Sequence, residues 1–220
     1  MMLVVTGIDK TGKSTLSRKL ADFLQAEYKH FSKPPVKAHA YFAEVFKHKA
    51  RKHVVVDRWC EGDYIYAKGM GHEQRLTVHE LDSLLKEAEA KGLIYIFCWD
   101  HEVDVRRRFK HEKETFVPPN KIGKIQKLFL DEAKRLASRY TFPVLLMNNF
   151  TNELEVLSYG TGTGMSGRLL PQLVSGAFED SFNIRSKDKP KGTANQGNAG
   201  LRVPSRQRGK SLDSDPCKKA

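Results

Sequence analysis

A short stretch near the start of the sequence has residue types and a spacing that suit the binding of phosphate. Gly7–Ser14 fits the pattern G-x-x-x-x-G-K-[ST], follows the apolar run Leu3–Val5 and precedes an amphipathic stretch. Glycine at both ends of this P-loop lets the backbone turn with its N–H groups pointing inward. The pattern predicts that Lys13 reaches the β- and γ-phosphates of a nucleotide and that the Ser14 hydroxyl binds Mg²⁺. The loop residues expected around the nucleotide are Gly7, Asp9, Thr11, Gly12, Lys13, Ser14 and Thr15.

Two charged segments later in the chain are candidates for the rest of a site. Asp57 and Arg58 end an apolar run, and ligands of open α/β sheets bind at the carboxyl ends of strands. A structural salt bridge is the alternative interpretation of this pair. The three consecutive arginines 106–108 lie in the charged run 101–113, which fits either an anion clamp or a solvated helical face. The place of this run directly after a predicted strand favours the clamp.

Apolar patterns predict the elements that must position these residues. Five strands are expected at Leu3–Val5, Tyr28–Ser32, His53–Asp57, Leu93–Trp99 and Phe142–Met147, the last of which closes the sheet. Helices are expected from the P-loop to about Gln25 or Tyr28, within 36–50, from a capping box at Thr77 and Glu80 through Ala90, and after a cap at Asn120. The alternation predicts an α/β fold, a five-stranded parallel sheet with helices on both faces.

Composition predicts one main domain and a tail of different character. We expect a nucleotide-binding domain over 1–158, with a short helix at Thr151–Leu157, then a linker or weakly structured extension over 159–184. The segment 185–220 holds ten Lys and Arg against three Asp, seven of the twelve net positive charges, and has few large apolar residues. It is predicted to be disordered, because it cannot offset its ordering entropy by burial.

Other classes of protein are disfavoured by the composition. With 40% hydrophobic and 29% charged residues the 220-residue chain resembles an ordinary soluble protein. Its first apolar run is too short for a signal-peptide core, and no run approaches the ~18 residues of a membrane span, so a cytoplasmic location is expected. Three cysteines without metal-type spacing indicate reduced thiols.

A P-loop specifies a nucleoside triphosphate but not its fate. GTPase-type switches are disfavoured, because no Asp-x-x-Gly follows a strand in the expected place and the last predicted strand leads into Asn148-Asn149-Phe150 rather than a guanine-binding Asn-Lys-x-Asp. A small phosphotransferase is the remaining class.

Three elements together resemble a known family. The P-loop sequence GIDKTGKST, the element Asp57-Arg58-Trp59 and the arginine-rich run from Arg106 resemble thymidylate kinase and related deoxynucleoside monophosphate kinases, including shorter versions carried by phages. The resemblance covers about residues 1–158. It implies ATP as the donor, Mg²⁺ as the metal, a homodimer as in relatives, and the host cytoplasm as location for a phage protein.

The resemblance implies a role for each matching residue. Asp9 would contact the sugar 3′-hydroxyl, and Lys10 stands where some members place a catalytic arginine between the two phosphates. Asp57 would lie near Mg²⁺ and the acceptor phosphate, and Arg58 would hold that phosphate. Tyr66 stands where relatives have an aromatic residue that crowds the sugar 2′ position, which favours deoxyribose.

Further residues would complete the acceptor site and its cover. Arg106, Arg107 and Arg108 would form a lid over the donor. Lys33 replaces a Phe-Pro-x-Arg-type element of relatives and is a candidate contact of the acceptor phosphate. Phe42, within the predicted helix 36–50, is a candidate for facing the acceptor pocket.

The acceptor class follows from the charge after the second strand. Deoxynucleoside kinases need a base there for a neutral 5′-hydroxyl, whereas Lys33 suits a phosphate dianion. The sequence therefore predicts γ-phosphoryl transfer from ATP to a deoxynucleoside monophosphate. Gly62 and Ala67 replace residues common in thymidylate kinases, so the base is either thymine or drawn from a broader set. A deoxynucleoside kinase is the alternative, as is a polynucleotide 5′-kinase or nucleic-acid-binding ATPase that uses the basic tail.

Overall fold

Three central strands are buried on both faces of the sheet. In the computed structural model of the chain, β1 (Met2–Gly7) lies between β3 (Val54–Asp57) and β4 (Leu93–Cys98), and every residue of these strands is buried. Continuous burial of this kind is typical of parallel strands that are covered on both sides. The structure describes residues 1–32, 35, 37–46, 53–110, 117–160 and 183–186, which belong to one compact unit, Met1–Asp188.

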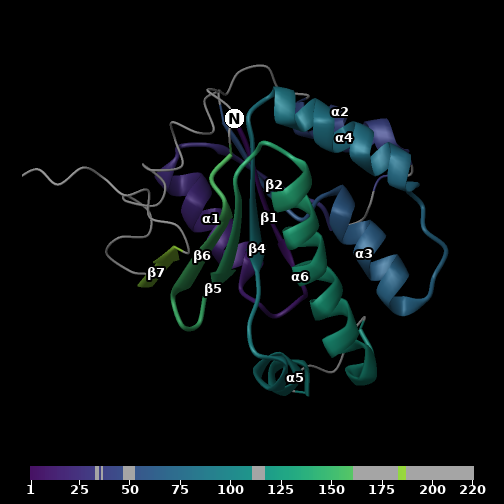
Figure 1. The fold of residues 1–220 in the computed structure, drawn as a ribbon, viewed down its shortest axis with the longest axis vertical. Coiled ribbons are helices and arrows are strands. Elements are labelled where there is room, and N and C mark those ends of the chain that lie inside the picture. Colours follow the sequence, from purple (N-terminus) through teal and green to yellow (C-terminus); the bar gives the residue numbers. More distant parts are fainter. Residues whose placement is uncertain (33–34, 36, 47–52, 111–116, 161–182, 187–220) are drawn as a thin grey trace, which may run out of the picture. The chain divides into compact units, whose positions relative to one another are not determined.

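The strand order is β2-β3-β1-β4-β5-β6-β7, with β2 at Glu27–His30, β5 at Val144–Asn148, β6 at Glu153–Ser158 and β7 at Asn183–Ser186 (Figure 1). The first five strands in this order are parallel, β6 is antiparallel to β5, and β7 is parallel to β6. The carboxyl ends of the five parallel strands therefore meet at one edge, where the predicted site residues lie.

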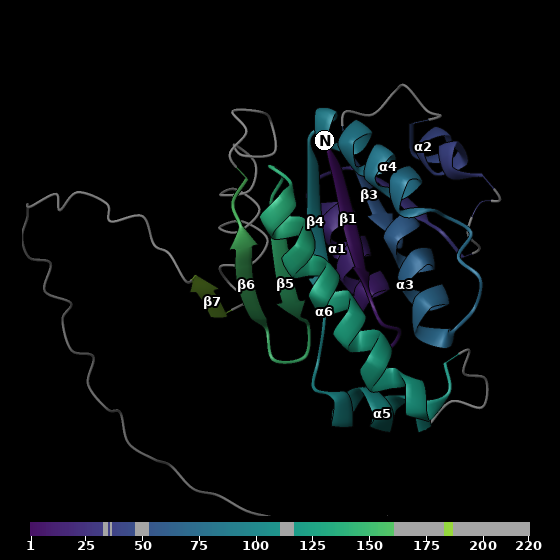
Figure 2. The same ribbon diagram turned by 45° about the vertical axis from the view of Figure 1, so that its right-hand side comes forward.

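Helices cover both faces of the sheet (Figure 2). On one face α1 (Lys13–Phe23) packs against alternate residues of the central strands. On the other face lie α2 (Ala38–Phe46), α3 (Cys60–Met70), α4 (Val78–Ala90) and α6 (Ile122–Arg139). The short α5 (Glu102–Lys110) follows β4 and adds Val105 and Phe109 to the hydrophobic core on this second face. A 3₁₀ turn, Pro119–Lys121, leads into α6.

The predicted α/β fold with helices on both sides of a mostly parallel sheet is confirmed, as is the capping box of α4. Thr77 Oγ1 accepts from the Glu80 N–H at 3.2 Å, and Glu80 Oε2 accepts from the Thr77 N–H at 2.8 Å. Asn120, predicted to cap the last helix, lies instead in the 3₁₀ turn, and α6 has no side-chain cap.

The prediction was wrong at the sheet edge. Thr151–Leu157 was expected to form a helix, but Glu153–Ser158 forms β6, so β5 does not close the sheet. Burial alternates along this segment, because Leu154 and Val156 are buried whereas Glu153 and Glu155 are half-buried. A period of two residues is typical of a strand. Helix α3 was not predicted. Apart from Asn183–Ser186, most of the predicted extension and tail lies outside the described residues.

Within the described residues, no helix combines the length and apolar character needed to cross a membrane.

Two glycines of α3 should respond oppositely to alanine. A Cβ at Gly69 would lie 2.4 Å from Ile125 Cγ1 in α6, whereas at Gly62 the nearest atom would be Thr6 Oγ1 at 3.9 Å. Gly69→Ala is expected to lower the free energy of unfolding by about 1–2 kcal/mol, since overpacking outweighs helix propensity. Gly62→Ala is expected to raise it by about 0.5 kcal/mol. Urea unfolding of both variants checks this, and equal midpoints would contradict it.

Candidate active site

The loop between β1 and α1 has a backbone that few residue types can follow. Gly7 has a φ of 133°, and a Cβ atom there would lie 2.2 Å from the Cys98 carbonyl oxygen on β4. Gly12, the N-cap of α1, has a φ of 80°, and Lys10 also has a positive φ, of 69°. The glycines thus permit the tight turn between strand and helix that the sequence pattern predicts.

Lys13 is buried within this loop. Its side chain is 4% exposed, and Nζ donates hydrogen bonds to the Ile8 carbonyl oxygen at 2.8 Å and to Asp9 Oδ1 at 3.1 Å. Burial lowers the pKa of the Lys13 amine, an effect that the Asp9 carboxylate opposes. The amine is therefore held in the centre of the loop.

Asp9 links the loop to two other segments. Its Oδ1 accepts a hydrogen bond from Arg58 Nη2 at 2.7 Å as well as the one from Lys13, and its backbone N–H donates to Tyr66 Oη at 2.9 Å. Burial disfavours the charged carboxylate, but Lys13 and Arg58 outweigh this, so the pKa of Asp9 lies below its usual range. Two cationic side chains thus share one carboxylate.

A cavity of about 540 Å³ adjoins this charge cluster. Its walls include five aromatic side chains, Phe31, Tyr41, Trp59, Tyr66 and Phe129, and its polar lining includes Thr6, Asp9, Arg58, Asp63, Glu73 and Arg75. Within the described structure, Tyr41 Oη and Trp59 Nε1 are buried without a hydrogen-bond partner. Apolar walls with a few polar groups are typical of a site for a small organic ligand.

Asp57 lies at the end of β3 and is fully buried. Its Oδ2 accepts a hydrogen bond from Tyr28 Oη at 2.8 Å and contacts His30 Nδ1 at 2.9 Å. Among the described residues, Oδ1 has no hydrogen-bond partner. No group of three or more His, Cys, Asp or Glu in the described structure is arranged to hold a metal ion.

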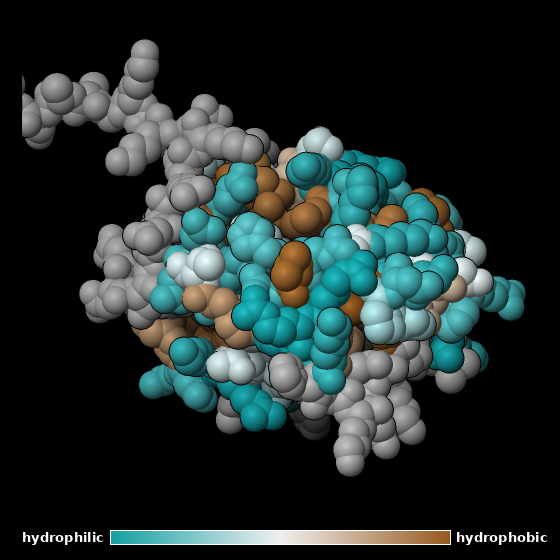
Figure 3. Space-filling model, turned by 90° about the horizontal axis from the view of Figure 1, so that it is seen from below, coloured by the Kyte–Doolittle hydropathy of each residue, from teal (hydrophilic) through white to brown (hydrophobic). Residues whose placement is uncertain are grey.

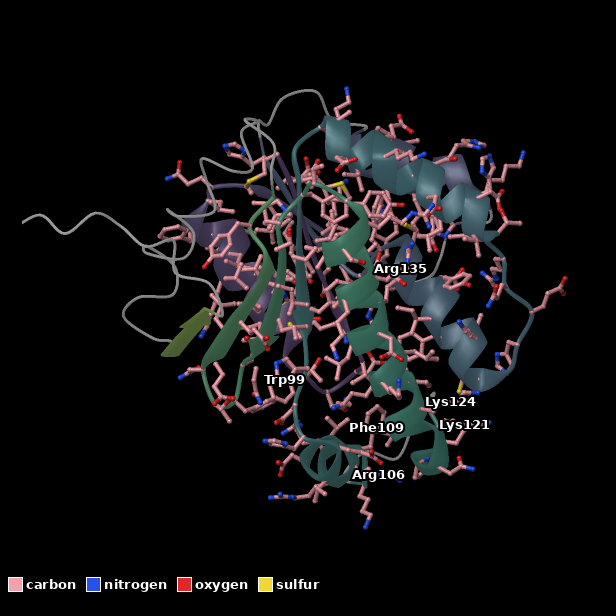
Figure 4. All side chains as sticks on the ribbon, in the orientation of Figure 1. Trp99, Arg106, Phe109, Lys121, Lys124 and Arg135 are labelled. Carbon is pink, nitrogen blue, oxygen red and sulfur yellow. The ribbon has the colours of Figure 1, made fainter. Side chains whose placement is uncertain are left out.

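The three consecutive arginines have different surroundings. Arg106, labelled in Figure 4, donates hydrogen bonds to Glu102 on the same helix and to the Pro119 carbonyl oxygen. Arg107 pairs with Asp104 on the same helix and is 66% exposed. These two side chains therefore bind locally. The face seen from below, toward α5, is mostly hydrophilic with a few apolar residues (Figure 3).

Arg108 differs because it contacts the P-loop. Its Nε donates to the Lys10 carbonyl oxygen at 2.8 Å, Nη2 pairs with Asp100, and the guanidinium lies 3.9 Å from the centre of the Phe150 ring. Among the three arginines, Arg108 is thus the one that joins α5 to the phosphate-binding loop.

Asp100 and Asn149 were not predicted as site residues. Asp100 follows β4 and is buried; burial opposes its ionisation, but Arg108, the His101 N–H and Asn148 hold its pKa below the usual range. Asn149 follows β5 and donates to the Thr11 carbonyl oxygen at 3.1 Å. The rule that selected Asp57, a polar residue at the carboxyl end of a strand, would also have found these two.

The structure brings Asp9, Lys13, Arg58 and Tyr66 together. Phe42 packs against the core, whereas Tyr41, its neighbour in α2, lines the cavity. Lys33, predicted to contact the acceptor phosphate, lies outside the described residues.

Comparisons with known proteins find the fold but no family. No family model matches the chain, and no curated protein matches its sequence. The solved structure of the YorR protein from Bacillus subtilis in complex with phosphorylated GDP matches with a TM-score of 0.53, at 17% identity over 79% of this chain and 94% of that one. The likeness to YorR shows a shared fold.

Two kinases are more distant structural matches. Deoxyadenosine kinase from M. mycoides has a TM-score of 0.39 at 17% identity, covering 63% of this chain and 86% of that one. A gluconokinase from Sinorhizobium meliloti 1021 has a TM-score of 0.38 at 18% identity, covering 58% and 73%.

Removal of the Arg108 guanidinium should destabilise the protein. Arg108→Ala leaves the buried Asp100 carboxylate without its cation, so we expect a loss of about 2–3 kcal/mol in the free energy of unfolding at pH 7. Arg107→Ala, at an exposed pair, should change it by less than about 0.5 kcal/mol. Urea unfolding without added nucleotide measures both.

The Arg108→Ala effect should also depend on pH. An aspartate whose folded pKa is depressed contributes stability above its unfolded pKa of about 4, and this contribution is lost as the pH falls through the folded value. Without Arg108 the Asp100 carboxyl takes up a proton at higher pH, which relieves the unpaired charge. The difference in the free energy of unfolding between wild type and Arg108→Ala should therefore become smaller on acidification from pH 7. A difference that grows would contradict the assignment of Arg108 as the partner of Asp100.

Proposed function

We propose that this chain is an ATP-dependent kinase that transfers the γ-phosphoryl group to a nucleoside monophosphate, with deoxynucleotides as the preferred acceptors. The observation that carries the proposal is the Lys13–Asp9–Arg58 cluster. It joins a phosphate-binding loop to an aromatic cavity and pairs two cationic groups with one carboxylate oxygen. Donor and acceptor phosphates would meet at this junction.

The loop and α1 would hold the donor. Backbone N–H groups at the start of the helix favour anions, and phosphate oxygens would replace the Ile8 carbonyl oxygen as the partner of Lys13. Ser14 and the unpartnered Asp57 Oδ1 suit Mg²⁺, which binds to one or two protein oxygens together with phosphates and waters. Held there, Mg²⁺ would supply positive charge against the negative charge that develops on the phosphates.

The cavity would hold the acceptor. Arg58 would bind the acceptor phosphate, because its Nε is buried without a partner in the described structure and its Nη2 is already oriented by Asp9. Asp9 and Tyr66 would contact the sugar, as the family resemblance implies. YorR was solved with phosphorylated GDP, a ligand of the chemical class proposed here.

A nucleoside kinase is the second candidate, favoured by the presence of Asp9 in the cavity wall. An ionised carboxylate can accept the proton of a 5′-hydroxyl. However, Asp9 is paired with two cations that depress its pKa and weaken it as a base. This charge balance favours the monophosphate.

Lys13 provides the first test of the proposal. Lys13→Ala removes a preorganised cation from the transition state, so turnover of ATP with an acceptor should fall by at least about 10²–10³-fold. Lys110→Ala, at an exposed position near the end of α5, should leave turnover within about twofold. A coupled assay for ADP measures both, and normal turnover by Lys13→Ala would exclude the kinase.

The acceptor class requires a panel of acceptors. ATP-dependent turnover with dTMP, dGMP, dCMP, dAMP, UMP, thymidine and a 5′-hydroxyl oligonucleotide should be fastest with one or more deoxymonophosphates. Turnover only with thymidine would establish the nucleoside kinase instead. Turnover only with the oligonucleotide would transfer the assignment to a polynucleotide 5′-kinase.

A further inference from the structure

We infer that the acceptor base in this cavity carries an exocyclic amino group, as guanine, cytosine and adenine do, and that Asp63 and Arg75 select it against thymine and uracil. The inference rests on the proposed function for the statement that the cavity holds a nucleotide.

Asp63 and Arg75 form a second charged group in the cavity wall. Asp63 lies in the first turn of α3, and Arg75 lies in the segment between α3 and α4, so two separate segments bring opposite charges to one cavity. Burial raises the pKa of Asp63, and the charge of Arg75 opposes this rise. This group is separate from the Asp9 cluster, in which Lys13 and Arg58 supply the cations.

Both side chains have hydrogen-bonding capacity left for a ligand. Within the described residues, neither Asp63 nor Arg75 makes a hydrogen bond or a close ion pair to another side chain. The nearby hydroxyl of Tyr41 is buried, also without a partner in that part of the chain. A half-buried carboxylate, the guanidinium of the exposed Arg75 and a buried hydroxyl therefore line one cavity with their polar atoms available.

The chemistry of these groups favours particular bases. An ionised carboxylate only accepts hydrogen bonds, and a guanidinium only donates them. Guanine offers two adjacent donors, N1–H and the 2-amino group, beside the acceptor O6. Cytosine offers the 4-amino donor beside the acceptors N3 and O2, and adenine offers the 6-amino donor beside the acceptors N1 and N7. Each base can therefore satisfy a carboxylate and a guanidinium at the same time.

Thymine and uracil do not fit this pair. Their single N3–H lies between two carbonyl oxygens, so a carboxylate that accepts from it places its second oxygen against a carbonyl. Buried polar groups left unpaired in this way are what a site uses to reject a similar substrate. The exclusion of thymine is thus a repulsive element of the site as well as a lost contact.

The remaining walls allow any of the three amino-bearing bases. Gly62 and Ala67 line the cavity next to Asp63 and Tyr66 and have little or no side chain. A Cβ at Gly62 would have only one atom within 4 Å, Thr6 Oγ1 at 3.9 Å, so the wall is open there. The aromatic residues would cover the faces of the base.

The test compares binding of dGMP, dCMP, dAMP and dTMP to the full-length protein by calorimetry, without ATP. Wild type should bind at least one of the first three at least tenfold more tightly than dTMP, and their order identifies the base. Asp63→Asn should weaken that preferred nucleotide at least tenfold and bring dTMP within about threefold of it, because an amide N–H can donate to a thymine carbonyl. Glu87→Gln, which removes an exposed carboxylate of α4 that is not among the residues lining the cavity, is the matched control and should preserve the wild-type ratio.

The outcomes separate this inference from the proposed function. Equal binding of dTMP by wild type would overturn the inference even if phosphoryl transfer to monophosphates is observed. An unchanged ratio in Asp63→Asn, or the same change of ratio in Glu87→Gln, would overturn the assignment to Asp63. Failure of every monophosphate to react with ATP would overturn the proposed function instead. Should Asp63→Asn fail to fold, the wild-type ratio alone still decides.

Discussion

The Asp9 carboxylate joins three segments that are distant in the sequence. Its side chain bonds Lys13 at the start of α1 and Arg58 after β3, and its backbone N–H bonds Tyr66 of α3. A buried carboxylate is costly unless it is paired, and here two cations offset that cost. The phosphate-binding loop and the cavity consequently share one wall, so the position of Asp9 sets the geometry of both.

Similar contacts hold the polar residues at the carboxyl ends of β3 and β4. Asp57, the last residue of β3, contacts Tyr28 and His30, and Asp100, after β4, contacts Arg108 and Asn148. The apolar strands deliver these polar residues to one edge, where burial makes each one require a partner. Arg108 satisfies Asp100 and the P-loop backbone together, which fixes α5 against the loop.

Local patterns predicted the parts of the fold that local physics determines. The P-loop, the central strands and the Thr77 capping box each follow from a few neighbouring residues. The segment Glu153–Ser158 had the alternation of a strand, and reading it as a helix overlooked that period.

Contacts between residues that are far apart in the sequence could not be predicted from local patterns. Arg58 and Asp9 are 49 residues apart, and Arg108 and Lys10 are 98 apart. Nothing in their local sequence identifies the partner. The position of Phe42 depends on packing for a related reason. Adjacent helical residues point about 100° apart, so only the packing of α2 decides that Tyr41, rather than Phe42, lines the cavity.

The chemical character of the proposed acceptor follows from three kinds of surroundings in the cavity. Cations lie where the cavity meets the P-loop, aromatic rings form its walls, and a separate carboxylate and guanidinium line it with hydrogen bonds unused among the described residues. A small polyol could not cover the aromatic walls, and an apolar ligand would leave the charged groups desolvated and unpaired. A molecule with a phosphate, a flat ring and a polar ring edge satisfies all three environments at once. The geometry therefore favours a nucleotide over a sugar or a lipid as the occupant of this cavity.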